Sequence, residues 1–189
     1  MFHALTGCDT VSGFTGHGKR KAWATWKAFP ELTTALIEVQ RDPEDIAEDA
    51  LMVVERFVVL LYDRTNTCSN VDAVRRKLFI HGRSVEAIPP TSAALLQHLR
   101  RAIFQAGYVW HQMLSPMMNL PDPADWGWQT EDDPGQWCYT PRWTTLPEAS
   151  ALQELVSCGC QKGCKGRCKC KHAGLKCTDL CKCEGICEA

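Results

Sequence analysis

The sequence of 189 residues lacks several features that would each place it in a broad class. It has no run of about 18 apolar residues, so we predict no membrane span. Its first residues lack a basic segment followed by a long apolar one, so we expect no secretory signal. It also has no H-E-x-x-H, Walker loop or G-x-S-x-G motif, which removes three common enzyme patterns. We therefore expect a protein of the cell interior, in the nucleus or another reducing compartment.

The chain also lacks a strong net charge, but its charges are unevenly distributed. The total is −1, with 45% hydrophobic and 23% charged residues, values typical of a globular protein. Residues 1–118 carry 13 basic and 12 acidic side chains, 119–157 carry one and seven, and 158–189 carry seven and three. We predict three parts with these bounds: a helical domain, an acidic strap rich in Trp and Pro, and a basic tail rich in Cys.

The first part has apolar residues at helical spacing and no convincing alternation of period two. We expect helices at 19–29, 32–39, about 43–61, 71–79 and 91–114. The run Asp42-Pro43-Glu44-Asp45 is typical of a helix start, and Asn70 and Thr91 are candidate caps. Leu95, Leu99, Ile103 and Phe104 form the expected core face of the last helix. The predicted fold class is therefore all-α for this domain.

Residues 119–150 combine four tryptophans with five prolines. Prolines interrupt regular structure, and large apolar rings favour burial. We predict an irregular strap packed on the helical domain, with a short helix within 146–156. The alternative is a surface whose tryptophans bind a protein partner or stack on nucleic-acid bases.

Nine of the twelve cysteines lie in the last 32 residues, with only three large apolar side chains among them. Such a segment has no core of its own and needs another source of stability. Clustered thiolates favour zinc, a redox-silent metal that takes tetrahedral sulfur ligands. The predicted ligands are Cys158, Cys160, Cys164, Cys168, Cys170, Cys177, Cys181, Cys183 and Cys187.

The number nine favours a cluster of three zincs over separate fingers. Two four-cysteine sites would leave one cysteine over, whereas three tetrahedral zincs need twelve bonds, which nine thiolates supply if three of them bridge. The alternatives are disulfides, which the odd number and the missing secretory signal disfavour, and a purely structural zinc module. His172 is a further candidate ligand, although nine cysteines already suffice.

The spacing C-x-C-x3-C-x3-C-x-C-x6-C-x3-C-x-C-x3-C resembles the tesmin/TSO1-like CXC domain and, more distantly, the pre-SET cluster of histone methyltransferases. The resemblance implies three zincs held by nine cysteines, and DNA binding. A tyrosine of that family enters the minor groove, and Arg167 stands at its position here, where an arginine could enter a narrow groove. The resemblance then makes phosphate contacts of Lys162, Lys165, Lys169, Lys171 and Lys176.

The N-terminal residues Gly7-Cys8-Asp9, Gly13, Gly16-His17-Gly18 and Ala22 resemble a signature of flap-endonuclease and XPG-type nucleases of the PIN-like fold. The resemblance implies that Asp9 binds Mg²⁺ or Mn²⁺ and that Gly16, Gly18 and Lys19 contact phosphate. The alternative is a tight loop in which Asp9 is only a cap. Two-metal hydrolysis needs several carboxylates, and only eight residues precede Asp9. We therefore expect the C-terminal part of a longer chain, or a truncated gene model, without nuclease turnover as it stands.

The overall layout also resembles animal proteins linked to mobile elements, a resemblance that implies no particular activity. The sequence leads to a zinc-binding protein that binds DNA or chromatin through its tail. One alternative is part of a metal-dependent 5′-nuclease that is inactive as it stands. The other is a scaffold whose strap binds protein partners.

Overall fold

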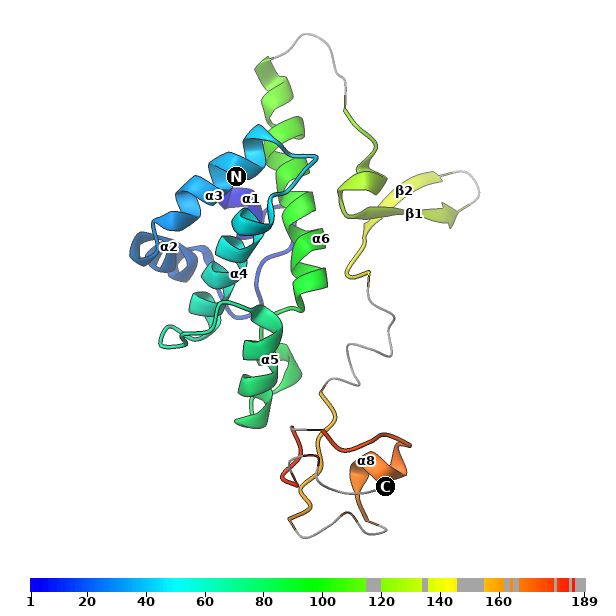
Figure 1. Cartoon of the computed structure of the whole chain (residues 1–189). Helices are drawn as coiled ribbons and strands as arrows, with labels where there is room; N and C mark the ends of the chain where they lie inside the picture. The colour runs from blue at the N-terminus through cyan, green and yellow to red at the C-terminus, as the bar shows by residue number, and fades with distance from the viewer. Residues whose placement is uncertain are drawn as a thin grey trace. The chain divides into compact units, whose positions relative to one another are not determined.

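A computed structural model describes residues 1–114, 120–133, 136–145, 155–161, 164, 167–178, 180–183 and 185 (Figure 1). The chain divides into two compact units. The first comprises Met1–Arg75 with Val85–Thr145, and the second comprises Arg76–Ser84 with Leu146–Ala189. In the described residues, no helix is both long enough and apolar enough to cross a membrane.

Helices form most of the first unit, and this confirms the predicted fold class. The α-helices are α1 (Phe2–Leu5), α2 (Lys19–Ala28), α3 (Glu31–Arg41), α4 (Glu48–Tyr62), α5 (Val71–Ile80), which continues into the second unit, and α6 (Ser92–Ile103). A π-helical segment, Phe104–Val109, continues α6, and 3₁₀ turns lie at Val85–Ala87, His111–Leu114 and Pro123–Trp126. Helix α8 (Lys169–His172) belongs to the tail.

The predicted helix caps Asn70 and Thr91 are confirmed by their hydrogen bonds. Asn70 Oδ1 accepts a hydrogen bond of 2.9 Å from the Ala73 N–H at the start of α5. Thr91 Oγ1 accepts one of 3.2 Å from the Ala94 N–H at the start of α6. Each cap satisfies a backbone donor that the first helical turn leaves without a partner.

The core of the first unit forms around α6 and α4. The predicted apolar face of α6 (Leu95, Leu99, Ile103 and Phe104) is buried, together with Val54, Phe57, Val58 and Leu61 of α4. Helix α1 packs against α6, and helices α2 and α3 pack against α4. Burial of these side chains is the main stabilising contribution to such a bundle.

The predicted start of α4 is wrong. We expected the helix to follow Asp42 directly, but it begins at Glu48. Helix α3 extends to Arg41, and the Asp42 N–H donates to the Glu38 carbonyl, so Asp42 ends α3 instead of starting α4. Glu48 and Asp49 are the acids that lie in the first turn of α4, where the helix dipole favours them.

The predicted long helix at 91–114 keeps its direction but changes its winding after Ile103. Residues 104–109 are π-helical, and a 3₁₀ turn at His111–Leu114 follows. The Trp110 N–H bonds the Gln105 carbonyl five residues back. Gly107 lies in this segment, where the lack of a side chain weakens an α-helix.

The strap packs on α6, as predicted, but it is not irregular throughout, because it contains a hairpin that periodicity did not reveal. Strands β1 (Trp128–Asp133) and β2 (Gln136–Pro141) pair antiparallel, with Trp128 opposite Pro141 and Asp133 opposite Gln136 (Figure 1). The Pro-Gly dipeptide between them is a turn signal in the sequence. Most of the short helix predicted within 146–156 lies outside the described residues.

Trp126 and Arg101 attach the strap to the helices. Trp126 is buried against Tyr108, with ring centroids 4.9 Å apart. Arg101 Nη1 donates to the carbonyls of Gly127 and Arg142, at 2.9 and 2.7 Å. Gly127 has φ +82°, and a Cβ there would lie 2.5 Å from the Gln97 carbonyl oxygen, so a larger residue does not fit.

Candidate metal centre

Eight of the nine tail cysteines are described, and all eight gather in one cluster. Cys158, Cys168, Cys170, Cys181 and Cys183 are buried, and Cys160, Cys164 and Cys177 pack against them. Cys187 lies outside the described residues. Thiols gathered this closely without disulfides are typical of metal sites in proteins.

The eight sulfurs form three overlapping groups of four that could each hold a metal ion. The groups are Cys158, Cys160, Cys164 and Cys168; Cys158, Cys168, Cys170 and Cys177; and Cys158, Cys177, Cys181 and Cys183. Cys158 belongs to all three groups, and Cys168 and Cys177 each belong to two. Four sulfurs per group match the tetrahedral coordination of structural zinc.

The distances between the sulfurs match those of ligands that share one metal ion, and they are too long for disulfide bonds. In a tetrahedron with Zn–S bonds of about 2.3 Å, neighbouring sulfurs lie about 3.8 Å apart. Cys158 Sγ lies 3.7 Å from Cys164 Sγ and 3.8 Å from the sulfurs of Cys177 and Cys183. Cys168 and Cys177 lie 4.0 Å apart. A disulfide bond would need about 2.05 Å, and these cysteines are free.

Helix α8 positions two of the sulfurs. Cys168 is its N-cap residue and Cys170 lies in its first turn, and both are buried. Arg167, Lys169 and Lys171 alternate with these cysteines and are exposed. Successive side chains therefore place sulfur inside the cluster and positive charge outside it.

Backbone groups favour the thiolate form at two of the cysteines. A hydrogen bond from the Lys171 backbone N–H, with smaller contributions from neighbouring thiols, lowers the pKa of Cys168 to about 6. Burial opposes ionisation of Cys181, but hydrogen bonds from the backbone of Cys158 and Thr178 lower its pKa to about 7. Burial raises the pKa of Cys170 to about 12. Because thiolates are the ligands, metal binding at this cluster releases protons.

The basic residues predicted to contact DNA are only partly described. Arg167, Lys169, Lys171 and Lys176 are exposed. Lys162 and Lys165 lie outside the described residues. His172 is exposed at the end of α8 and does not occur in the three cysteine groups, so it is not among the described candidate ligands.

In the N-terminal motif, Asp9 is not grouped with other possible metal ligands of the described residues, and Lys19 contacts the protein backbone. Asp9 is exposed and belongs to no candidate metal group of the described residues. The Lys19 ammonium donates to the carbonyls of His3 and Gly7 and to Thr6 Oγ1, so it closes the end of α1. Metal binding by Asp9 and phosphate contacts by Gly16, Gly18 and Lys19 stay predictions from the resemblance.

Local backbone geometry explains glycines of this motif without any ligand. Gly7 has φ +102°, and a Cβ there would lie 2.9 Å from the Gly13 Cα, so the chain crosses itself at these two glycines. The Cys8 N–H bonds the Val11 carbonyl within the loop. Gly16 has φ +74° with open space around it, and Gly18 is the N-cap residue of α2. These contacts favour the tight-loop interpretation of the motif.

The sequence did not predict a role for Arg101, which binds the strap and lies 6.0 and 5.5 Å from the ring centroids of Trp128 and Trp143. No motif or spacing in the sequence singled out this residue, because its partners lie 26 and 41 positions away. Comparisons of the whole chain with protein-family models, curated proteins and solved structures find no match.

Proposed function

We propose that the tail binds three zinc ions through nine cysteines and that this cluster binds DNA. The observation that carries the proposal is the overlap of the three four-cysteine groups at Cys158, Cys168 and Cys177. Three tetrahedral zincs need twelve Zn–S bonds, and nine thiolates supply twelve when three of them bridge two metals each.

The three shared cysteines are the natural bridging ligands. Cys168 and Cys177 each occur in two groups, which is the share of a bridging thiolate. Cys158 occurs in all three groups. If Cys187, the ninth ligand, replaced Cys158 in one group, Cys158 would also bridge two metals. The CXC resemblance of the cysteine spacing leads to the same stoichiometry.

The charge distribution supports DNA as the partner. Nine thiolates and three Zn²⁺ carry a charge of −3, and the seven basic and three acidic side chains of the tail bring its net charge to about +1. Arg167, Lys169, Lys171, Lys176 and Lys182 are exposed around the cysteines. Exposed cations on a rigid zinc-held scaffold suit the phosphate backbone, and Arg167 is the candidate for contact within the minor groove.

The test is DNA binding by the zinc-loaded full chain, measured by fluorescence anisotropy with a labelled duplex at several salt concentrations. We expect the logarithm of the affinity to fall linearly with that of the salt concentration. Lys169→Gln with Lys171→Gln should lower affinity and reduce the salt slope by about two. Arg64→Gln is a control, because it removes an exposed charge far along the sequence from the tail.

Removal of zinc by a chelator distinguishes DNA binding that depends on the zinc cluster from simple attraction between basic residues and DNA. We expect DNA affinity to fall when zinc is removed and to return when zinc is restored, because the scaffold that orders the basic residues depends on the metal. Zinc binding without DNA affinity at physiological salt would reject DNA as the partner and favour the protein-binding scaffold. Equal DNA affinity with and without zinc would reject the role of the cluster.

A further inference from the structure

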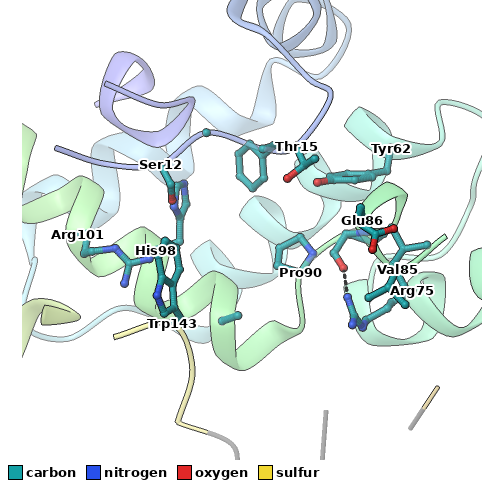
Figure 2. Close-up of a pocket in the computed structure, with 15 residues that line it drawn as sticks. Ser12, Thr15, Tyr62, Arg75, Val85, Glu86, Pro90, His98, Arg101 and Trp143 are labelled. Atoms are coloured by element: carbon teal, nitrogen blue, oxygen red, sulfur yellow. Dashed lines mark hydrogen bonds between the residues drawn. The ribbon is translucent and has the colours of Figure 1, made fainter. Parts of the chain in front are cut away.

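The first unit contains a cavity of about 260 Å³ that the zinc cluster does not involve. Its walls come from the loop after α1, the Pro89-Pro90 segment before α6, one face of α6, and Trp143 of the strap (Figure 2). Ala94, His98 and Arg101 of α6 line it at the spacing of one helical face. At its two ends lie Arg101 beside His98 and Trp143, and Arg75 beside Glu86 and Val85.

Arg101 is the unusual group of this cavity. Its side chain is only 2% exposed, yet no carboxylate of the described residues pairs with it. Its Nη1 is used by the carbonyls of Gly127 and Arg142. Its Nε and Nη2 have no hydrogen-bond partner in the described chain, and neither is among the polar atoms sealed from solvent without a partner. These N–H groups are therefore in contact with solvent, and Arg101 is one of the residues that line the cavity.

A buried guanidinium without a counter-ion is costly, because burial removes its hydration. Burial lowers the pKa of Arg101 to about 10, so the group stays charged at neutral pH. The ring centroids of Trp128 and Trp143 lie 6.0 and 5.5 Å from the guanidinium carbon of Arg101, and the rings stabilise its charge through cation–π interactions. The two remaining nitrogens are arranged as a fork that matches the two oxygens of an anion.

The other groups at this cavity favour an anion as well. Ser12 and Thr15 line it, and their hydroxyls have no hydrogen-bond partner among the described residues. Burial raises the pKa of Tyr62 to about 12, and its neutral hydroxyl carries no charge that would repel an anion. Among the described residues that line the cavity, Glu86 is the one carboxylate, against two arginines.

We propose that this cavity binds a small oxyanion, a phosphate monoester or a carboxylate, through Arg101 Nε and Nη2 with Ser12 as an additional donor. The volume suits a small metabolite and is below that of most drug-sized sites. Trp143 is 61% exposed at the cavity and offers a face to an aromatic ring on the ligand. The site is independent of the zinc cluster, so either proposal can fail without the other.

Isothermal titration calorimetry of the zinc-loaded full chain tests the site with three probes: inorganic phosphate, phenyl phosphate and benzoate. We expect saturable one-to-one binding of phenyl phosphate, and the other two probes separate the phosphate head from the carboxylate and from the aromatic ring. Arg101→Gln should weaken binding roughly tenfold or more, because it removes a charged hydrogen-bond donor. Arg100→Gln is the matched control, since it removes the neighbouring charge from the same helix but does not line this cavity.

Arg101 also attaches the strap, so two milder variants keep the proposal testable if Arg101→Gln does not fold. Ser12→Ala should weaken binding several-fold, because it removes one neutral donor. Glu86→Gln should tighten it, because it removes a negative charge from the lining. Binding of none of the three probes would overturn the proposal. Equal binding by folded Arg101→Gln, or by both milder variants, would also overturn it.

Discussion

Replacing Cys158 should cost the cluster more zinc than replacing any cysteine that belongs to a single group. Cys158 occurs in all three four-cysteine groups, whereas Cys160 occurs in one. Cys158→Ser therefore leaves at least two zinc ions with three sulfur ligands, even when Cys187 takes one of its places. Cys160→Ser leaves only one zinc ion in that state. The two cysteines are two positions apart and the substitution is the same, so they form a matched pair.

The magnitude follows from the energy of a structural zinc site. Such sites bind zinc with about 10–16 kcal/mol, so each of four thiolates accounts for roughly 3 kcal/mol, or about a hundredfold in affinity. At a chelator concentration that just leaves the wild-type chain fully loaded, Cys160→Ser should lose one zinc ion. Cys158→Ser should lose at least two under the same conditions.

Native mass spectrometry during a chelator titration measures these numbers directly. Cys68→Ser is the control for a cysteine outside the tail, and it should leave the zinc content unchanged. If Cys158→Ser and Cys160→Ser lose the same number of zinc ions, the assignment of Cys158 as a shared ligand is wrong.

Three further predictions concern the first unit, each measured by urea unfolding. Gly127→Ala should destabilise it by roughly 2–3 kcal/mol, because the new Cβ meets the Gln97 carbonyl, whereas Gly16→Ala should cost only about 1–2 kcal/mol for its positive φ; equal costs would contradict the close approach of the strap. Burial, against a hydrogen bond to the Leu5 carbonyl, lowers the pKa of His98 from 6.5 to about 4. The unfolded state then binds the extra proton first, so stability should fall between about pH 6.5 and 4, by up to roughly 3 kcal/mol; a slope that His98→Gln leaves unchanged would refute this. Thr91→Ala should cost about 1 kcal/mol through the lost cap of α6, and no change would show that the cap is unimportant.

Local interactions explain what the sequence could predict about the fold. Asn70 and Thr91 were found as caps because a cap is a hydrogen bond between residues three apart in the chain. The same reasoning failed at Asp42, where two helices compete for one short acidic segment and α3 uses it. The hairpin was missed because its strands carry mixed polar and aromatic residues in place of clear alternation.

For the candidate sites too, the sequence predicted what depends on local spacing and missed what depends on contacts between distant residues. Cysteine spacing predicted a multinuclear zinc site, because nine ligands within 30 residues leave few other solutions. The overlap at Cys158, Cys168 and Cys177 depends on how the chain folds back on itself, so spacing alone could not assign it. Arg101 depends on contacts with residues 26 and 41 positions away, which no local pattern encodes.

The most direct test of the central claim is the zinc content of the purified full chain by native mass spectrometry under non-denaturing conditions. We predict three zinc ions per chain, no disulfides, and release of all three ions on chelation. Two zinc ions would contradict the shared-ligand cluster and favour separate four-cysteine sites. No zinc, with masses that reveal disulfides, would contradict the metal centre altogether.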